Sequence, residues 1–268
     1  TFPPILWGFD NLQAGALRPW EGTGSYYEEP HLASFLGRVN YTYDDRYVLT
    51  VNARTDASSK FGANHKWGFF PSVSAAWNVS NEQFMKQITW IDNLKLRLGY
   101  GLAGNQGGID SYTTMNLVRP NGVAPVGNSP VVTYETLRNI NPDLKWEVKH
   151  TFNAGFDVGF YGNRLLLSVN YYNSKTTDML YNYRVSVPPF TYNTLLANIG
   201  SMRNSGTEIS VGITPLKTKD MELNINANIT FQKNKLLSLN GMYNGEYISA
   251  SEYTVIAGLD GAGFSWRI

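Results

Sequence analysis

The sequence predicts an all-β chain that forms part of an antiparallel transmembrane β-barrel. Residues 221–232, MELNINANITFQ, carry an apolar side chain at every odd position and a polar one at every even position. A period of two gives a strand one apolar and one polar face. Segments of about ten residues with this alternation recur along the chain, and a tilted strand of that length crosses a membrane. Their polar faces are rich in asparagine and poor in lysine and glutamate, which favours a barrel wall.

The composition agrees with this fold class. Aromatic residues make up 14% of the chain and charged residues only 16%, and aromatic side chains suit a pleated sheet. The formal net charge of +1 gives no reason to expect nucleic acid as a partner. No run of about 18 apolar residues occurs, so no transmembrane helix is expected. The chain has no cysteine, which excludes disulfides and thiolate metal sites within it.

Eight strands are expected, and in each of them the residues of one parity are apolar. In the segment 93–104, for example, Leu94, Leu96 and Leu98 alternate with Lys95 and Arg97. Lipid is expected to face the apolar set and a lumen the polar set. The expected strands are 33–43, 46–56, 67–79, 93–104, 146–161, 164–177, 204–215 and 221–234.

Short and long connections alternate between these strands. Outer-membrane barrels have short periplasmic turns and longer extracellular loops, so the length of a connection predicts its side of the membrane. Asp44-Asp45 and Gly162-Asn163 tolerate the positive φ of a tight hairpin. A short helix is expected at 81–86, capped within 80–82. Periplasmic connections are expected at 44–45, 80–92, 162–163 and 216–220, and long extracellular loops at 57–66, 105–145 and 178–203.

An aromatic girdle and a three-part organisation complete the prediction. Interfacial aromatic residues are typical of membrane barrels, and those expected near the periplasmic strand ends are Tyr41, Tyr43, Tyr47, Trp77, Phe160 and Tyr161. Residues 1–32 are expected to form a lead-in loop or strand region, 33–235 barrel strands and loops, and 236–268 an extracellular loop or next-strand region. The chain begins without Met or a signal peptide and is expected to be a fragment.

One chemical motif needs separate treatment. Residues 99–104, GYGLAG, match the G-x-G-x-x-G dinucleotide fingerprint after an expected strand. That fingerprint requires a helix to begin at the glycines, and the following residues, NQGG, begin none. The glycines are therefore expected to allow close backbone packing at a strand end. The three histidines share no ligand spacing, and no nucleophile, zinc or phosphate motif occurs, so no cofactor, metal or catalytic site is expected.

A series of motifs covers roughly residues 33–235. They are Arg38-Val39-Asn40-Tyr41, Asp45-Arg46-Tyr47, Arg54-Thr55-Asp56, Trp67-Gly68, Phe70-Pro71-Ser72, Leu94-Lys95-Leu96-Arg97, Gly104-Asn105-Gln106, Leu144-Lys145-Trp146-Glu147 and Asn204-Ser205-Gly206-Thr207-Glu208. In identity, order and spacing these motifs closely resemble the SusC/RagA family of TonB-dependent outer-membrane transporters.

The resemblance implies more than this chain contains. It implies a barrel of about 22 strands, of which about eight are present here, with a plug in its lumen. It also implies coupling to TonB through a segment outside this chain, a SusD-like surface lipoprotein as partner, and import of oligosaccharides or peptides. The plug and the C-terminal strands that the family implies are expected to lie outside this sequence. The implied location is the outer membrane of a Gram-negative, Bacteroidetes-like cell, with the lipid bilayer around the strands.

Two alternatives remain open. A soluble β-sandwich that binds carbohydrate would show the same alternation, with its apolar set turned inward. The polar faces and a loop of about forty residues speak against this alternative. A passive porin would have the same membrane strands, and periodicity does not distinguish it from an energised transporter.

Two sets of candidate functional residues follow. Charged residues on the polar parity are expected to face the lumen or plug, because an unpaired charge inside a wall is costly. These are Arg38, Arg54, Asp56, Lys95, Arg97 and Glu208. Polar and aromatic residues near or within the longest loop offer hydrogen bonds and ring faces for a substrate. These are Asn105, Gln106, Tyr112, Arg119, Asn121 and Tyr134.

Overall fold

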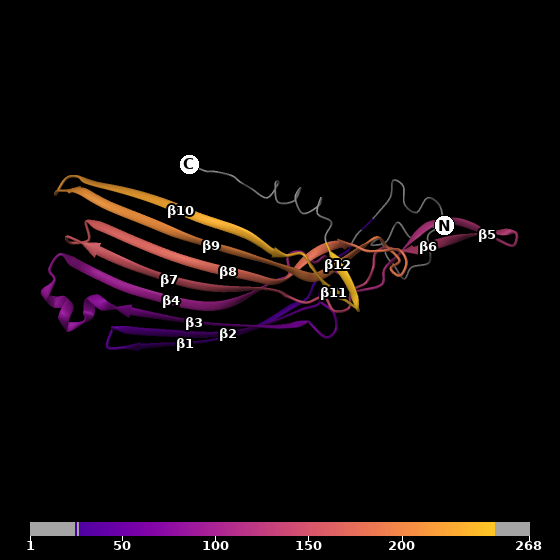
Figure 1. Cartoon of the computed structure of the whole chain (residues 1–268), viewed down its shortest axis with the longest axis horizontal. Helices are drawn as coiled ribbons and strands as arrows, with labels where there is room; N and C mark the ends of the chain where they lie inside the picture. The colour runs from indigo at the N-terminus through magenta and orange to yellow at the C-terminus, as the bar shows by residue number, and fades with distance from the viewer. Residues whose placement is uncertain (1–24, 26, 250–268) are drawn as a thin grey trace.

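The computed structural model describes residue 25 and residues 27–249, and within them an eight-stranded antiparallel sheet is the main element (Figure 1). Its strands follow the order β1-β2-β3-β4-β7-β8-β9-β10. Their bounds are Leu32–Tyr43 (β1), Tyr47–Ser58 (β2), Trp67–Asn78 (β3), Ile91–Asn105 (β4), Glu147–Phe160 (β7), Leu165–Arg184 (β8), Thr194–Lys217 (β9) and Glu222–Ser238 (β10). No helix among the described residues is long and apolar enough to cross a membrane.

All eight predicted strands are present. Neighbours in the sheet are neighbours in the sequence, except that β4 pairs with β7 across the insertion that carries β5 (Val118–Val126) and β6 (Ser129–Thr136). The expected fold class, a partial antiparallel barrel wall of about eight strands, is confirmed. The expected 1–32 region lies mostly outside the described residues, as does 250–268, so the predicted three-part organisation stays a prediction.

The two faces of the sheet differ as the alternation requires. One face, called the apolar face below, exposes large hydrophobic side chains such as Val39 (67% exposed), Leu98 (57%) and Phe231 (59%). The other, called the polar face, carries the opposite parity, including Asn52, which donates to Ser72 on the next strand. No second layer of described residues covers the apolar face along the middle of these strands. The described chain is therefore not a two-layer sandwich.

One end of the sheet, called the turn end below, has the predicted tight connections. Asp44 and Asp45 adopt φ of 50° and 51°, and Gly162 and Asn163 adopt 70° and 58°. Predicted girdle residues gather here. The Tyr47 ring stacks on Tyr43 (6.5 Å between centroids) and on Trp77 (6.2 Å), and the Phe160 ring stacks on Trp90 (5.6 Å), which was not among the predicted residues.

The β3–β4 connection differs from its prediction. It forms two short 3-10 helices, η2 (Val79–Asn81) and η3 (Gln83–Gln87), in place of one helix at 81–86, and neither has a side-chain cap. The Glu82 carboxylate is engaged elsewhere. It accepts hydrogen bonds from the Tyr47 hydroxyl (2.8 Å), the Trp77 indole (3.0 Å) and Arg46 (3.0 Å). The prediction was wrong because these three donors hold Glu82 against the strand ends.

The opposite end, called the loop end, is more ordered than predicted. The segment 178–203 was expected to be a long loop, yet β8 continues to Arg184 and β9 begins at Thr194, which leaves 185–193 as the connection. Register shifts between Thr176 and Leu180 break the period of two. Because a bulge changes which parity faces the core, the sequence alternation stops before the strand does.

The predicted loop 105–145 is also partly regular. It contains the hairpin β5–β6, which projects beyond the sheet at the loop end (Figure 1). Beyond β10 a second hairpin, β11 (Asn240–Tyr243) with β12 (Glu246–Ser249), lies against the extended β8 and β9. Ile248 of this hairpin packs with Tyr183, Leu195 and Ala197 in one buried cluster.

A second buried cluster fastens the outer loops to the sheet. Phe61, Phe70, Ile109 and Trp146 are each at least nine-tenths buried. The Trp146 indole lies 4.6 Å from the Phe61 ring and 5.5 Å from the Phe70 ring, measured between centroids, and donates to the Lys66 carbonyl at 3.1 Å. The loops after β2 and β4 and the segment before β7 therefore share one small core.

The glycines of the G-x-G-x-x-G match serve this packing, as predicted. A Cβ on Gly104 would lie 2.1 Å from the Phe70 ring, and one on Gly101 would lie 2.8 Å from the Ser72 Cβ. Both glycines sit within β4, and no helix follows them. The motif permits close approach between β3 and β4.

Three asparagine side chains replace strand pairing where 139–145 crosses the extended β9. Asn139 donates to the carbonyls of Tyr192 and Thr194, and Asn141 donates to the Leu196 carbonyl. Asn198 accepts from the Lys145 amide and donates to its carbonyl. These side chains satisfy backbone groups that an irregular segment would otherwise leave unpaired.

Replacing Trp146 with Ala should loosen the loop end while the strands stay assembled. Truncation of a buried aromatic side chain costs about 3–5 kcal/mol of folding free energy. In the protein encoded by the complete reading frame, Trp146→Ala is expected to lower the unfolding temperature and expose residues 59–66 to protease. The matched control is Trp67→Ala, because the Trp67 ring is 58% exposed on the apolar face. Equal protease sensitivity of the two variants would contradict the packing.

Replacing Glu82 with Gln should change how stability depends on pH. Hydrogen bonds from Tyr47 and Trp77 hold the pKa of the Glu82 carboxyl below its usual value. A lowered pKa stabilises the folded state above the unfolded-state pKa of about 4.3, and this contribution disappears as pH falls through the folded pKa. Thermal unfolding between pH 7 and pH 3 should show a smaller acid loss for Glu82→Gln than for the wild type. Glu222→Gln, at an exposed position of the same end, should keep the wild-type profile.

Candidate functional site

The polar face is arranged in rows that cross the sheet, because paired residues on neighbouring strands lie side by side. One row joins Ala76 to Arg97, then Gly155, Asn170 and Glu208. The adjacent rows place Lys95 beside Asn78 and Asp157, and Ser74 beside Thr50 and Gly99. The register therefore brings Lys95, Arg97 and Glu208, which are far apart in sequence, onto one surface.

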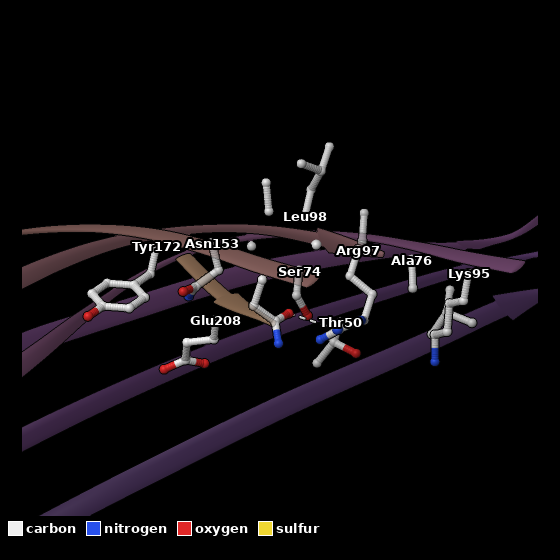
Figure 2. Close-up of a pocket in the computed structure, with 15 residues that line it drawn as sticks. Thr50, Ser74, Ala76, Lys95, Arg97, Leu98, Asn153, Tyr172 and Glu208 are labelled. Atoms are coloured by element: carbon white, nitrogen blue, oxygen red, sulfur yellow. Dashed lines mark hydrogen bonds between the residues drawn. The ribbon is translucent and has the colours of Figure 1, made fainter. Parts of the chain in front are cut away.

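This surface is hollowed into a depression of about 400 Å³ (Figure 2). Small residues, among them Ser74, Ala76 and Gly99, form part of its lining, and Lys95 and Glu208 also belong to it. Figure 2 shows Leu98 pointing to the side of the strands opposite to Glu208, as strand alternation requires. Amides, hydroxyls and isolated charges thus line a water-accessible hollow.

Arg97 is the organising side chain of the depression. One of its terminal nitrogens donates to Asp157 on β7 (2.9 Å) and to Asn170 on β8 (2.8 Å), and Ser168 donates to the same Asp157 oxygen at 2.7 Å. Arg97 reaches β8 by crossing Gly155, where an added Cβ would lie 2.4 Å from the Asn170 amide oxygen. One guanidinium therefore connects three strands.

The other predicted lumen-facing residues lie on the same polar face. Arg54 pairs with Asp56 at 2.7 Å, and Arg38 donates to Asn52 at 2.6 Å. Within the described part of the chain, Lys95 and Glu208 form no ion pair within 4 Å. Both side chains line the depression instead.

The predicted substrate-binding residues do not form one cluster. Asn105 donates to Glu147 (2.8 Å), and the neighbouring Gln106 has a buried amide oxygen without a hydrogen-bond partner among the described residues. The Tyr112 hydroxyl accepts a hydrogen bond from the Glu29 amide (3.3 Å), and its backbone adopts φ of 63°. Asn105 is the last residue of β4, and Gln106 and Tyr112 lie in the segment between β4 and the hairpin.

The remaining three candidates lie on the hairpin β5–β6. Glu135 accepts from Arg119 (2.6 Å) and from Asn121 (2.7 Å), so both donors are already engaged. The hydrogen bond to Glu135 also raises the pKa of Arg119. Tyr134 lies beside Glu135 in the strand and so faces the other way, with 59% of its surface exposed. It is the candidate most available to a ligand.

Sequence reasoning missed the partners that hold these residues. These partners are Asp157 and Asn170 for Arg97, Glu135 for Arg119 and Asn121, and Glu147 for Asn105. Strand register across 60 or more residues joins Arg97 to Asp157 and Asn170, and no local signal encodes that register. Gly155 is the one sequence signal for this contact, because the Arg97 guanidinium passes over it and a side chain there would crowd it.

Comparisons with known proteins agree with this architecture. The family model described as TonB dependent receptor-like, beta-barrel matches residues 6–267. The chain is 34% identical over 247 residues to the TonB-dependent receptor SusC of Bacteroides thetaiotaomicron. The aligned region covers 85% of this chain and 24% of the relative. The chain is also 37% identical over 225 residues to the TonB-dependent receptor P26 of Formosa agariphila. This aligned region covers 81% of this chain and 22% of the relative.

Solved structures give the same result. The RagAB peptide importer in its open-open state matches with a TM-score of 0.71 and 28% identity, over 88% of this chain and 27% of that one. The closed-closed state matches with a TM-score of 0.68 over 82% of this chain and 24% of that one. The chain spans about a quarter of the length of its relatives. It belongs to the TonB-dependent receptor β-barrel family, with SusC and RagA as the branch it resembles, and is an outer-membrane protein.

Proposed function

We propose that this chain supplies part of the wall of an energised outer-membrane importer that takes up oligosaccharides or peptides. The observation that carries the proposal is the eight-stranded antiparallel wall with an apolar and a polar face, in a chain matched by the receptor family over 6–267. In this function the apolar face contacts lipid, the polar face lines the lumen, and the loop end is extracellular.

The chemistry of the polar face supports a neutral, polar substrate. Strand β10 presents Asn226, Asn228, Thr230, Gln232 and Asn234 to the same side. Amides and hydroxyls both donate and accept hydrogen bonds, which suits sugar hydroxyls and peptide groups alike. Two solved relatives are named as a RagAB peptide importer, which favours peptides as one of the two classes.

The charges of the lumen fit contact with a plug. Lys95 and Glu208 lie on the same polar face without an ion-pair partner among the described residues, whereas Arg54 and Arg97 are paired within the wall. A plug that fills the barrel would offer partners of opposite sign to the first two. TonB would act on that plug through a segment outside this chain.

The loop end fits contact with a SusD-like surface lipoprotein. Val118, Val123 and Tyr134 of the hairpin β5–β6 share one face and are each more than half exposed. An apolar strand face of this kind, held beyond the membrane, is a surface for another protein. Tyr134 could serve either this partner or a sugar ring.

Energy dependence distinguishes this function from that of a passive porin. Cells that express the complete reading frame should take up a labelled oligosaccharide or peptide mixture, and uptake should fall to background when TonB is deleted or a protonophore is added. A lipoprotein should co-purify with the barrel. Uptake that persists without TonB would support the porin.

Single cysteines should report the two faces of the wall. This chain contains no cysteine, so an introduced thiol is not masked by native ones within it. In isolated outer membranes, Ser74→Cys on the polar face should react with a charged maleimide. Val73→Cys, its neighbour on the apolar face, should react only with a lipid-soluble reagent. The reverse pattern would exclude the proposed orientation of the wall.

A further inference from the structure

The apolar face carries a row of basic residues near the loop end. His150 on β7 is paired with Lys175 on β8, Lys175 with Arg203 on β9, and Arg203 with Lys235 on β10. Lys233 also lies on β10, two residues before Lys235 in the sequence, and is paired with Ser205 on β9. Because neighbouring strands lie about 4.8 Å apart, the row from His150 to Lys235 is roughly 14 Å wide, and the part from Lys175 to Lys235 is roughly 10 Å wide. Lys175, Arg203, Lys233 and Lys235 are called the basic row below.

The basic row lies on the side of the sheet that faces lipid. The same parity of β9 presents Ile209, Val211 and Ile213, and that of β10 presents Ile229 and Phe231. Towards the turn end, rows of aliphatic and aromatic side chains continue across β7 to β10. Figure 1 shows these four strands side by side in one layer. The apolar band therefore ends, and the cationic band begins, at a single level of the wall.

None of the four basic side chains has an anionic partner within the described residues, where all four are exposed. Asp178 is the acidic residue nearest to Lys175 along β8, and it is paired with Lys145 at 2.7 Å. On β7, His150 contacts the Tyr100 hydroxyl at 3.1 Å. Four cations thus lie together at the edge of an apolar surface, and no described residue supplies a counter-charge.

The position limits what can neutralise them. A substrate in the lumen lies on the other face of the sheet, and Lys and Arg side chains at this level can extend along the wall to the headgroup region. Arg binds phosphate oxygens through two parallel hydrogen bonds, and Lys binds them as a point charge. Anionic lipid headgroups are attracted to basic clusters at the membrane surface.

We propose that the basic row binds the phosphorylated headgroup of a lipid in the outer leaflet, whose acyl chains lie along the apolar rows of β8, β9 and β10. The ligand is held by charge at its headgroup and by burial of apolar surface below. This site goes beyond the import function, because it uses the opposite face of the sheet and takes a lipid that is not transported.

Native mass spectrometry of the detergent-purified, complete protein tests the proposal. The probes are lipid A carrying its phosphates and the same lipid with the phosphates removed. The wild type should retain the phosphorylated lipid about tenfold or more over the dephosphorylated one, since each Lys or Arg near an anionic headgroup strengthens binding. The variant Lys175→Gln/Arg203→Gln/Lys233→Gln/Lys235→Gln should lose this preference.

The matched control removes three Lys and one Arg at exposed positions of the turn end, Lys86→Gln/Arg164→Gln/Lys217→Gln/Lys219→Gln. It should retain phosphorylated lipid as the wild type does, and heat-modifiable gel mobility should show that both variants fold. Equal losses in both variants would overturn the proposal, because charge in general would then explain binding. Displacement of the lipid by inorganic phosphate in excess would also overturn it, since the site would then bind free phosphate.

Discussion

The need to pair every backbone N–H and C=O group governs this structure. In hydrocarbon no water is available to satisfy a polar backbone group, so strands cross a membrane only when each edge is paired. Seven antiparallel ladders join the eight strands here, and they use nearly every residue between the turns. Among the described residues, β1 and β10 each keep one edge without a strand partner. Each of these edges requires a further strand in the membrane.

Once the ladders fix the register, the two faces acquire different chemistry from the same residues. On the polar face, Gly155 leaves room for Arg97 to reach from β4 across β7 to β8. One side chain therefore connects two strands that are not adjacent in the sheet. On the apolar face, the same pairing sets Lys175 beside Arg203. Both arrangements depend on cross-strand neighbours rather than on neighbours in sequence. A shift of one residue in register would move each set to the other face.

The strands and tight turns were predictable from sequence because their signals are local. A period of two identifies a strand, and Asp44-Asp45 identifies a turn. The extended halves of β8 and β9 were missed because the irregularity near Met179 changes the parity that faces the core. The cross-strand partners of Arg97 and Glu82 depend on the register and on tertiary packing. The predicted loop residues are separated for a similar reason, since Arg119 and Asn121 sit on a hairpin that Asn105 does not join.

The extended strand β9 has a consequence for how the extracellular surface can change. With 24 residues it is roughly 80 Å long, whereas about ten residues suffice to cross the bilayer. The outer part is fastened by Asn139, Asn141 and Asn198 and by its own buried cluster. These contacts order the outer part of β9 in advance, so binding of another molecule to it would cost little conformational entropy. Substitutions at the tips of the β5–β6 and β11–β12 hairpins can therefore change this outer surface while the membrane wall keeps its register.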